Sequence, residues 1–172
     1  MNAIYSWFEG LIEPFPVEEP DQPPQGLLAF CWHYSKGIWP TLLLVSLLGM
    51  SVAVLEVLIF SYLGNVVDWL STSDRSTFLE NETDTLIWMG AVVLVIVPVL
   101  HLVWSLILHQ SVYGNYPMII RWQAHRYMLG QSMGFYQDEF AGRVATKVMQ
   151  AALGVRETVL KVLDVFAYVV VY

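Results

Sequence analysis

Two ionisable side chains lie inside long apolar runs, where a charged group needs a partner. Glu56 falls in the run 41–67 and His101 in the run 85–108. By the helical rise of about 1.5 Å per residue, Glu56 would lie near the middle of a bilayer. Such a group must face a partner or a water-filled cavity. Two interpretations stay open: a substrate-cavity or proton-linked carboxylate that would recognise organic cations, with His101 as a second candidate, or a carboxylate buried against a neighbouring helix.

A second stretch combines aromatic rings with polar and charged neighbours. It reads Phe135-Tyr136-Gln137-Asp138-Glu139-Phe140-Ala141-Gly142-Arg143-Val144. An aromatic anchor inside a polar rim is typical of a ball-and-socket contact between proteins. Gly142 would let the chain turn out of a short helix with a positive φ or a close backbone approach. The alternative is that the aromatic pair merely packs at the base of a helical hairpin.

Sequence motifs for catalysis and metal binding are absent. There is no GxxxxGK[ST] phosphate-binding loop, no Ser/His/Asp triad pattern and no catalytic carboxylate pair. His101 and His109 are eight residues apart, or about 80° around a helix, and nothing supplies a third metal ligand. The single cysteine, Cys31, excludes an intramolecular disulfide. We therefore predict that this chain is not an enzyme and that it binds no metal and no cofactor itself.

The composition is that of a membrane protein. Hydrophobic residues make up 56% of the 172 residues and charged residues only 13%, against roughly a quarter in soluble domains. The formal net charge of −7 argues against nucleic-acid binding, which needs a basic surface. The first 13 residues lack the basic start and long apolar core of a secretory signal, so we expect no cleavage there.

The apolar runs predict an all-α membrane protein with two complete spans. The spans are expected at 40–67 and 85–109, each longer than the roughly 20 residues that cross the hydrocarbon. For residues 1–25 the sequence predicts an amphipathic segment followed by an extended, solvated linker that is rich in proline and acidic residues. Residues 26–39 predict a short interfacial helix, and 68–84 a polar, acidic loop.

Beyond the second span the helical pattern continues to residue 134, bent at Pro117, and then returns. A short helix is expected at about 136–141 and a return helix at 143–164. Residues 165–172 are uniformly apolar but too few to cross a bilayer. We interpret them as the start of a third span, and the chain as a fragment of a larger protein.

The return helix carries two stripes. Apolar residues recur every three or four positions, at Val144, Val148, Ala151, Val155, Val159, Val162 and Phe166. Beside this stripe lies a polar one, in which Glu157 precedes Lys161 by four residues, the favourable order for a helical ion pair. We expect the apolar stripe to be buried.

The basic residues predict the orientation. Six of the eight Lys and Arg residues follow the second span: Arg121, Arg126, Arg143, Lys147, Arg156 and Lys161. The positive-inside rule makes that side cytoplasmic. The N-terminus is then cytoplasmic too and 68–84 external, in a multi-pass protein of the inner cell membrane.

The order of these elements resembles the N-terminal part of the transmembrane domain of an ABC exporter, from about Gly26 to Tyr172. The most specific matches are Phe135-Tyr136, then Gly142-Arg143-Val144, then Thr146-Lys147-Val148. Asp68 matches an acidic residue common at the outer end of the first span. The sequence departs from the family at Ala151, where an aspartate often follows the glycine by nine residues.

The resemblance implies that about 136–141 is a coupling helix, which docks in a groove of a nucleotide-binding domain. The implied contacts are Phe135, Tyr136, Gln137, Asp138, Glu139, Phe140, Gly142 and Arg143. It also implies three partners: the lipid bilayer, a nucleotide-binding domain that holds ATP and Mg²⁺, and a second transmembrane domain, identical or different. The implied function is the permease portion of an ATP-driven exporter of hydrophobic or amphipathic substrates.

Two other functions fit part of the pattern. In a membrane-anchored sensor module the amphipathic helix would continue as a coiled coil, whereas 165–172 becomes uniformly apolar. An inactive truncated membrane protein is the remaining alternative.

Overall fold

The chain folds into helices. A computed structural model describes residues 2–18, 20–72, 78–138 and 141–172. Over these residues the elements are α-helices and two π-helical turns, with no strand. The all-α fold class predicted from the sequence is confirmed.

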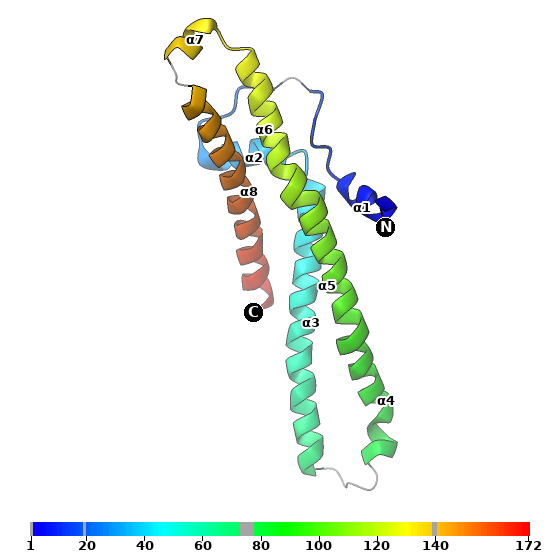
Figure 1. Cartoon of the computed structure of the whole chain (residues 1–172). Helices are drawn as coiled ribbons and strands as arrows, with labels where there is room; N and C mark the ends of the chain where they lie inside the picture. The colour runs from blue at the N-terminus through cyan, green and yellow to red at the C-terminus, as the bar shows by residue number, and fades with distance from the viewer. Residues whose placement is uncertain (1, 19, 73–77, 139–140) are drawn as a thin grey trace.

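Two long helical rods form the axis of the molecule, side by side and antiparallel (Figure 1). Two stretches are long and apolar enough to cross a membrane by length and composition: Trp39–Trp69 and Glu82–Leu129. The first rod is one helix, α3 (Trp39–Thr72). The second is a succession of helical segments: α4 (Phe78–Ala91), η1 (Val92–Ile96), α5 (Val97–Leu106), η2 (Ile107–Tyr113) and α6 (Gly114–Leu129).

The two π-helical turns of the second rod, η1 and η2, each precede a proline. Pro98 and Pro117 have no N–H to donate to the carbonyl four residues earlier, and their rings crowd that carbonyl. The carbonyls concerned belong to Leu94, inside η1, and Tyr113, inside η2. A π-turn widens the helix locally and relieves this crowding. The rod therefore stays helical past both prolines.

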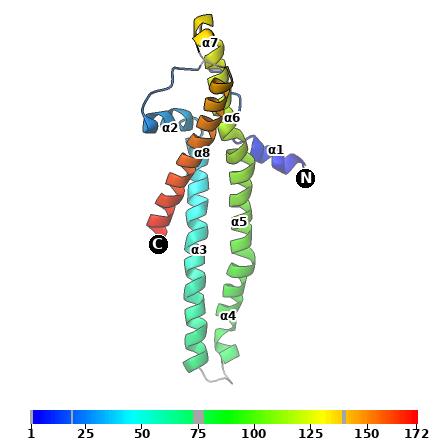
Figure 2. The same cartoon turned by 60° about the vertical axis from the view of Figure 1, so that its left-hand side comes forward.

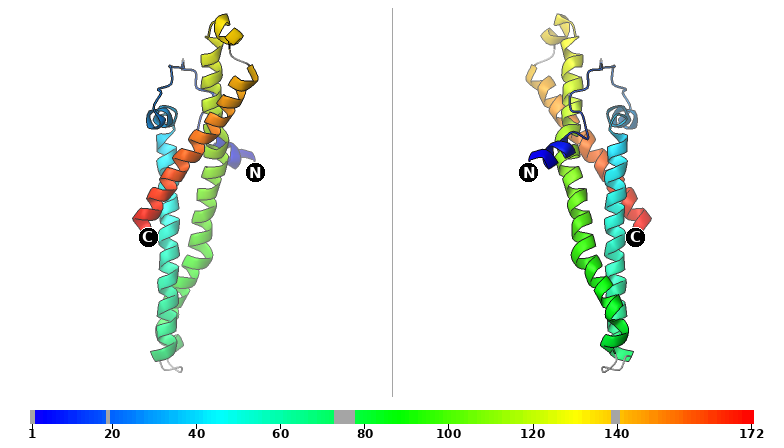
Figure 3. Two further views of the ribbon diagram at one scale, coloured as in Figure 1. Left: turned by 90° about the vertical axis from the view of Figure 1, so that its left-hand side faces the viewer. Right: turned by 90° about the vertical axis from the view of Figure 1, so that its right-hand side faces the viewer.

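A helical hairpin extends the second rod at the end away from the α3–α4 connection (Figure 1). It consists of α6, the short helix α7 (Met133–Asp138) and α8 (Ala141–Val171). The helix α8 packs beside α6 and then crosses α3 obliquely (Figure 3). The expected return helix and the apolar residues after 164 therefore form one continuous helix.

The boundaries differ from those expected at two places. α3 continues to Thr72 and α4 begins at Phe78, so most of the acidic loop expected at 68–84 is helical. Polar residues are compatible with helix ends, and the hydroxyl of Ser71 donates to the carbonyl of Asp68 at 2.8 Å. The short helix expected at about 136–141 begins three residues earlier, at Met133.

The core lies where α3, η2, α6 and α8 meet the short helix α2 (Leu27–Ser35). Leu42, Val112, Tyr116 and Ala152 are fully buried there, one from each of the four longer elements. Farther along the rods the large apolar side chains are exposed, for example Phe60 at 70%. An apolar surface of that extent requires lipid or further helices to cover it.

The buried face of α8 follows the apolar stripe expected from the sequence only as far as Val159: Val155 is buried, and Val144, Val148, Ala151 and Val159 are half-buried. Ala152, Val155 and Leu160 are buried, whereas Val162 and Phe166 are 62% and 58% exposed. In the C-terminal half of α8 both faces of the helix are apolar. The spacing of the apolar residues alone therefore could not predict which face is buried. The crossing against α3 decides which face is covered. The expected ion pair is also different, because Glu157 pairs with Arg156 at 2.5 Å instead of with Lys161.

The N-terminal linker, expected to be solvated, packs along the second rod. After α1 (Asn2–Glu9) the chain buries Ile12, which is 2% exposed, and places Phe15 edge-on against Trp122 with 5.3 Å between ring centroids. The prolines keep the segment extended, as expected, but polar side chains of η2 and α6 supply hydrogen bonds to its backbone. The described residues of the linker are therefore exposed or half-buried, as a solvated segment would be, but the backbone of 16–18 is bound to α6, which was not expected.

A buried hydrogen bond ties α2 to α6. The hydroxyl oxygens of Ser35 and Tyr116 are 2.6 Å apart, and Ser35 Oγ is also 2.6 Å from the carbonyl of Cys31. Because a serine hydroxyl has one hydrogen and the carbonyl can only accept it, Tyr116 donates to Ser35.

Removing this hydroxyl is expected to loosen α2. Tyr116→Phe keeps the ring but leaves Ser35 without its donor, a loss of about 1 kcal/mol. Amide hydrogen exchange in α2 should become about fivefold faster in the complete protein, since 1.4 kcal/mol corresponds to a factor of ten. Tyr127→Phe on the same helix is the control, and equal exchange rates in the two variants would contradict the assignment.

Candidate functional site

The aromatic pair expected to dock on a partner lies in α7, at the tip of the α6–α8 hairpin (Figure 1). Phe135 and Tyr136 are 36% and 39% exposed, and their rings meet edge to face at 5.3 Å. Met133, at the start of the helix, is 76% exposed. The tip therefore presents a small apolar surface at the end of the molecule farthest from the α3–α4 connection.

Tyr136 also fixes α7 to the rod. Its hydroxyl donates to the carbonyl of Met128 at 2.6 Å, in the last turn of α6. Carbonyls in the last turn of a helix have no partner within that helix. The backbone N–H of Phe135 donates to the carbonyl of Ser132 at 3.1 Å and so closes the turn between α6 and α7. The hydrogen bond from Tyr136 thus fixes the position of α7 relative to the end of α6.

The other residues expected at this contact fall on both sides of a break. Gln137 is exposed in α7, and Asp138 is the last residue of that helix. Glu139 and Phe140 lie outside the described residues. Gly142 lies inside α8, where its carbonyl accepts a hydrogen bond from the hydroxyl of Thr146 at 2.8 Å. The expectation that Gly142 forms the turn is therefore wrong. The next residue, Arg143, is exposed on α8.

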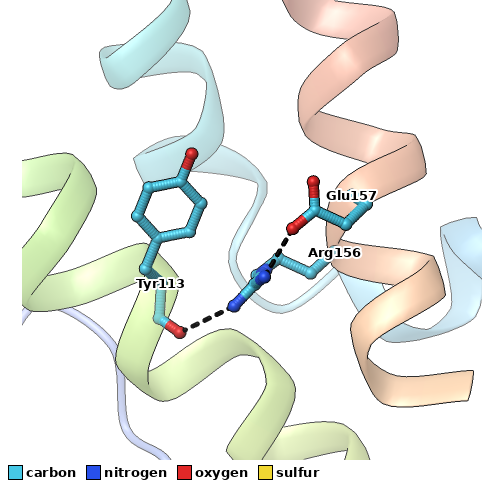
Figure 4. A network of polar contacts seen from close by, with 3 residues as sticks. All are labelled: Tyr113, Arg156 and Glu157. Carbon is cyan, nitrogen blue, oxygen red and sulfur yellow. Dashed lines mark hydrogen bonds and ion pairs between the residues drawn. The ribbon is translucent and has the colours of Figure 1, made fainter. Parts of the chain in front are cut away.

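A polar network joins α8 to the second rod (Figure 4). The Arg156 guanidinium donates to the Tyr113 carbonyl at 3.4 Å and lies 5.0 Å from the centre of the Tyr113 ring. Its other terminal nitrogen is 2.5 Å from the carboxylate of Glu157. The Tyr113 carbonyl is the one that Pro117 deprives of an N–H partner. A side chain from α8 therefore supplies a hydrogen-bond donor to a backbone carbonyl of the second rod.

A cavity of about 380 Å³ lies between α3, α5, η2 and α8. Its polar and aromatic lining consists of Ser46, Glu56, Trp104, Tyr113, Asp164, Tyr168 and Tyr172. The carboxylate of Glu56 accepts a hydrogen bond from the hydroxyl of Tyr172 at 3.3 Å. Gly49 also lines the cavity, and a Cβ there would be 3.3 Å from the indole nitrogen of Trp104. The glycine thus lets this indole approach α3.

His101 is not brought together with Glu56 in the cavity. Its ring is exposed on α5 and meets Trp104 edge to face, with 5.3 Å between centroids. Trp104 lines the cavity, so His101 stands behind it. Within the described ranges, no group of three His, Cys, Asp or Glu side chains is placed to hold a metal ion.

Burial shifts the pKa of three side chains on α2. It raises the pKa of the Cys31 thiol and of the Tyr34 hydroxyl, because each would be charged when deprotonated. It lowers the pKa of His33, with a smaller contribution from the positive charge of Lys36. The charge of Asp21 acts in the opposite direction. At neutral pH the Cys31 thiol is therefore protonated and poorly reactive.

Sequence reasoning did not single out Arg156, nor the polar side chains of η2 and α6 that bind the N-terminal segment. Pro117 was the available signal for Arg156, since it leaves a carbonyl unsatisfied in a helix with few polar neighbours. Ile12 and Phe15, apolar residues beside a proline-rich linker, were the signal for packing of that segment. Neither signal indicates which distant residue of the chain makes the contact.

Comparison with known proteins finds a related ABC transporter protein. Over 175 aligned residues the chain is 42% identical to an uncharacterized ABC transporter ATP-binding protein of Haemophilus influenzae. The match covers 99% of this chain and 28% of that relative. No protein-family model and no solved structure matches the chain.

This match corrects one expectation. The chain was expected not to be an enzyme, because it has no phosphate-binding loop. The relative that matches almost the whole chain is named an ATP-binding protein, which indicates an ATPase context instead. The reason for the error is that a missing local motif tests only the residues present, and these span 28% of the relative's length. By sequence, the chain is related to an ABC transporter.

Proposed function

We propose that this chain is part of the permease of an ATP-driven ABC exporter that moves hydrophobic or amphipathic compounds out of the cell. The observation that supports this most is the placement of α7. A short helix with exposed aromatic rings caps a hairpin that projects beyond two apolar rods. On this proposal α7 docks on a nucleotide-binding domain, and the rods cross the inner membrane with the N-terminus in the cytoplasm.

The contacts around the hairpin would let a movement of α7 reach the rods. Tyr136 ties α7 to the end of α6, and Arg156 ties α8 to η2. The helix α8 also packs against α3. Long helices coupled in this way move as rigid bodies, so a displacement at the tip would tilt the rods around the cavity.

The partners are part of the same proposal. ATP and Mg²⁺ would be held by the nucleotide-binding domain, in keeping with the name of the relative. A second transmembrane domain, identical or different, would cover the exposed apolar side chains of the rods that lipid does not. Phe60, Leu94 and Val169 are 70%, 76% and 72% exposed and belong to three different elements.

The cavity beside Glu56 suits an amphipathic cation. Two carboxylates there offer negative charge, and Trp104 and the tyrosines offer aromatic faces that attract cations. His101, behind Trp104, would adjust the position of that indole.

Glu56→Gln is expected to weaken stimulation of ATP hydrolysis by cationic amphiphiles. Losing one charged contact of about 1.5 kcal/mol would raise the half-maximal concentration about tenfold. Neutral amphiphiles should be unaffected, because the amide keeps the shape of the side chain. Glu157→Gln, a change outside the cavity lining, is the control. An equal shift for neutral and cationic compounds would contradict a charge-based role of Glu56.

Photo-crosslinking tests the proposed docking of α7. A photoreactive amino acid replaces Gln137, which is exposed on α7, or Asp84, near the opposite end of the second rod. In the complete protein, position 137 should form adducts with a nucleotide-binding domain, and position 84 should form none. Adducts of position 137 with lipid or with other surfaces alone would overturn the proposal.

A further inference from the structure

An N-terminal strap, residues 8–18, lies along η2 and α6; it begins in the last turn of α1 and continues from Gly10 to Glu18 without helix or strand. Its first half is held by two polar side chains of the rod. The hydroxyl of Ser111 donates to the carbonyl of Phe8 at 2.5 Å. The amide of Asn115 donates to the carbonyls of Glu9 and Ile12, at 2.9 and 3.0 Å. Ser111 is fully buried, so its bond to Phe8 is anchored in the packed core, whereas the two Asn115 bonds lie at the edge of that core.

The second half of the strap is held by Trp122 and Arg126. The indole N–H of Trp122 donates to the carbonyl of Pro16 at 3.1 Å. One terminal nitrogen of Arg126 lies 3.3, 2.9 and 2.8 Å from the carbonyls of Pro16, Val17 and Glu18. The strap is thus fixed through its backbone, which explains how a proline-rich segment without helical hydrogen bonds keeps one course.

This attachment sets the place of α1. The helix α1 ends at Glu9, beside Ser111 of the second rod. Ser111 follows Leu108, the last residue of the apolar run 85–108, by only three residues. It projects sideways from the rod there, while α2 lies on the other side at a similar level (Figure 2). If the rods cross a bilayer, α1 is held at the boundary between hydrocarbon and water.

The exposed side of α1 has the chemistry of that boundary. Trp7 and Tyr5 are 64% and 40% exposed, whereas Phe8 packs toward the core. Around the helix Glu9 lies about 160° from Trp7, on the opposite, polar side, and Ser6 lies between the two. Tryptophan and tyrosine are favoured at membrane interfaces because their rings are apolar at one end and polar at the other. The helix contains no Lys or Arg, so attraction to anionic lipid does not contribute.

We infer that α1 lies in the membrane interface, with Trp7 among the lipid headgroups and upper acyl chains, and that the strap holds it there. The inference rests on the proposed membrane location of the rods. The partner is the bilayer surface itself, including a zwitterionic one, because the contact depends on aromatic burial and not on charge. The exposed apolar side chains of the adjoining rod, such as Leu102 and Val99, continue this surface.

Fluorescence quenching by lipid tests the inference. The complete protein carrying Cys31→Ser and Trp7→Cys is labelled with an environment-sensitive fluorophore and placed in phosphatidylcholine vesicles containing nitroxide-labelled lipid. Quenching at position 7 should be at least about twofold stronger than with the label on Glu9→Cys, which is exposed on the opposite side of the same helix. It should not change when anionic lipid is added. Equal quenching at the two positions, or crosslinking of position 7 to a second copy of the chain, would overturn the inference.

A third labelled position separates this inference from the membrane proposal. Leu94→Cys, on η1, replaces a side chain that is 76% exposed in the apolar rod. Strong quenching at position 94 without quenching at position 7 would refute the role of α1 and leave the membrane proposal intact. No quenching at position 94 would refute both.

The role of the strap has its own variant. Asn115→Ala combined with Arg126→Gln removes most of the donors to the strap. Quenching should then become similar at positions 7 and 9, because the helix is no longer held in one orientation. A difference that persists in this variant would show that α1 binds lipid without the strap, and would refute that part of the inference.

Discussion

Replacing Tyr136 with aspartate in the complete protein is expected to abolish substrate-stimulated ATP hydrolysis and efflux while basal hydrolysis continues. The ring is an exposed aromatic anchor at the tip of the hairpin, and such anchors typically contribute about 2–4 kcal/mol to an interface. Aspartate would place a charge in the partner's groove and would also remove the hydrogen bond to the Met128 carbonyl. Efflux should fall at least about thirtyfold, since each 1.4 kcal/mol is a factor of ten.

Two further variants separate docking from the position of α7. Tyr136→Phe keeps the ring and loses only the hydroxyl, so its efflux should fall by about fivefold or less, corresponding to about 1 kcal/mol. Gln150→Asp introduces the same charge on an exposed position of α8 and should leave efflux unchanged. Unchanged efflux and unchanged stimulation of hydrolysis in Tyr136→Asp would refute the coupling role of this helix.

The rods could be predicted from the sequence because apolar length is a strong local signal. The apolar runs that contain Glu56 and His101 are longer than the roughly 20 residues that cross a bilayer, and a helical stretch extends through each run. Their ends were harder to predict. Hydropathy falls at Asp68, but the helix continues to Thr72, since backbone hydrogen bonding does not depend on whether a side chain is polar.

The contacts of the N-terminal strap could not have been predicted, because they join residues about a hundred positions apart. Prolines and acidic residues favour an extended, solvated chain, and the strap is indeed extended. What keeps it on the rod is a set of donors, Asn115, Trp122 and Arg126, spaced along one side of α6. In the sequence each of these looks like an ordinary polar residue at a membrane border.

The candidate site residues illustrate the same limit. The aromatic pair Phe135 and Tyr136 falls in a short helix at a hairpin tip, as the local pattern suggested. The turn expected at Gly142 must lie before it, because α7 ends at Asp138 and α8 already begins at Ala141. Glu56 faces a cavity between α3, α5, η2 and α8, and its hydrogen-bond partner, Tyr172, is 116 residues away.

The link between α8 and the second rod depends on a single arginine at an unusual position. Pro117 leaves the Tyr113 carbonyl without its helical donor, and the Arg156 guanidinium takes that role while stacking over the Tyr113 ring. The Nε of Arg156 is buried without a hydrogen-bond partner, so the side chain is held by its terminal nitrogens alone. The arginine is only 19% exposed, whereas its neighbour Glu157 is 54% exposed. The exposed ion pair therefore contributes little, and the carbonyl and ring contacts dominate.

Arg156→Met is accordingly expected to free α8 from the rod. The loss of a charged hydrogen bond and of a cation–π contact amounts to about 2–3 kcal/mol. Amide hydrogen exchange in the middle of α8 should accelerate about 30- to 100-fold in the complete protein. Lys161→Met, an exposed change one turn later, should leave exchange unaffected.

A double-mutant cycle tests why the arginine matters. Pro117→Ala restores the N–H that normally bonds to the Tyr113 carbonyl, so the carbonyl depends less on Arg156. In that background Arg156→Met should accelerate exchange in α8 at least fivefold less than it does beside Pro117, a coupling of about 1 kcal/mol. If the two changes instead combine independently, the arginine acts through the Tyr113 ring or through general packing. The proline would then not be the reason that α8 carries a cation at this position.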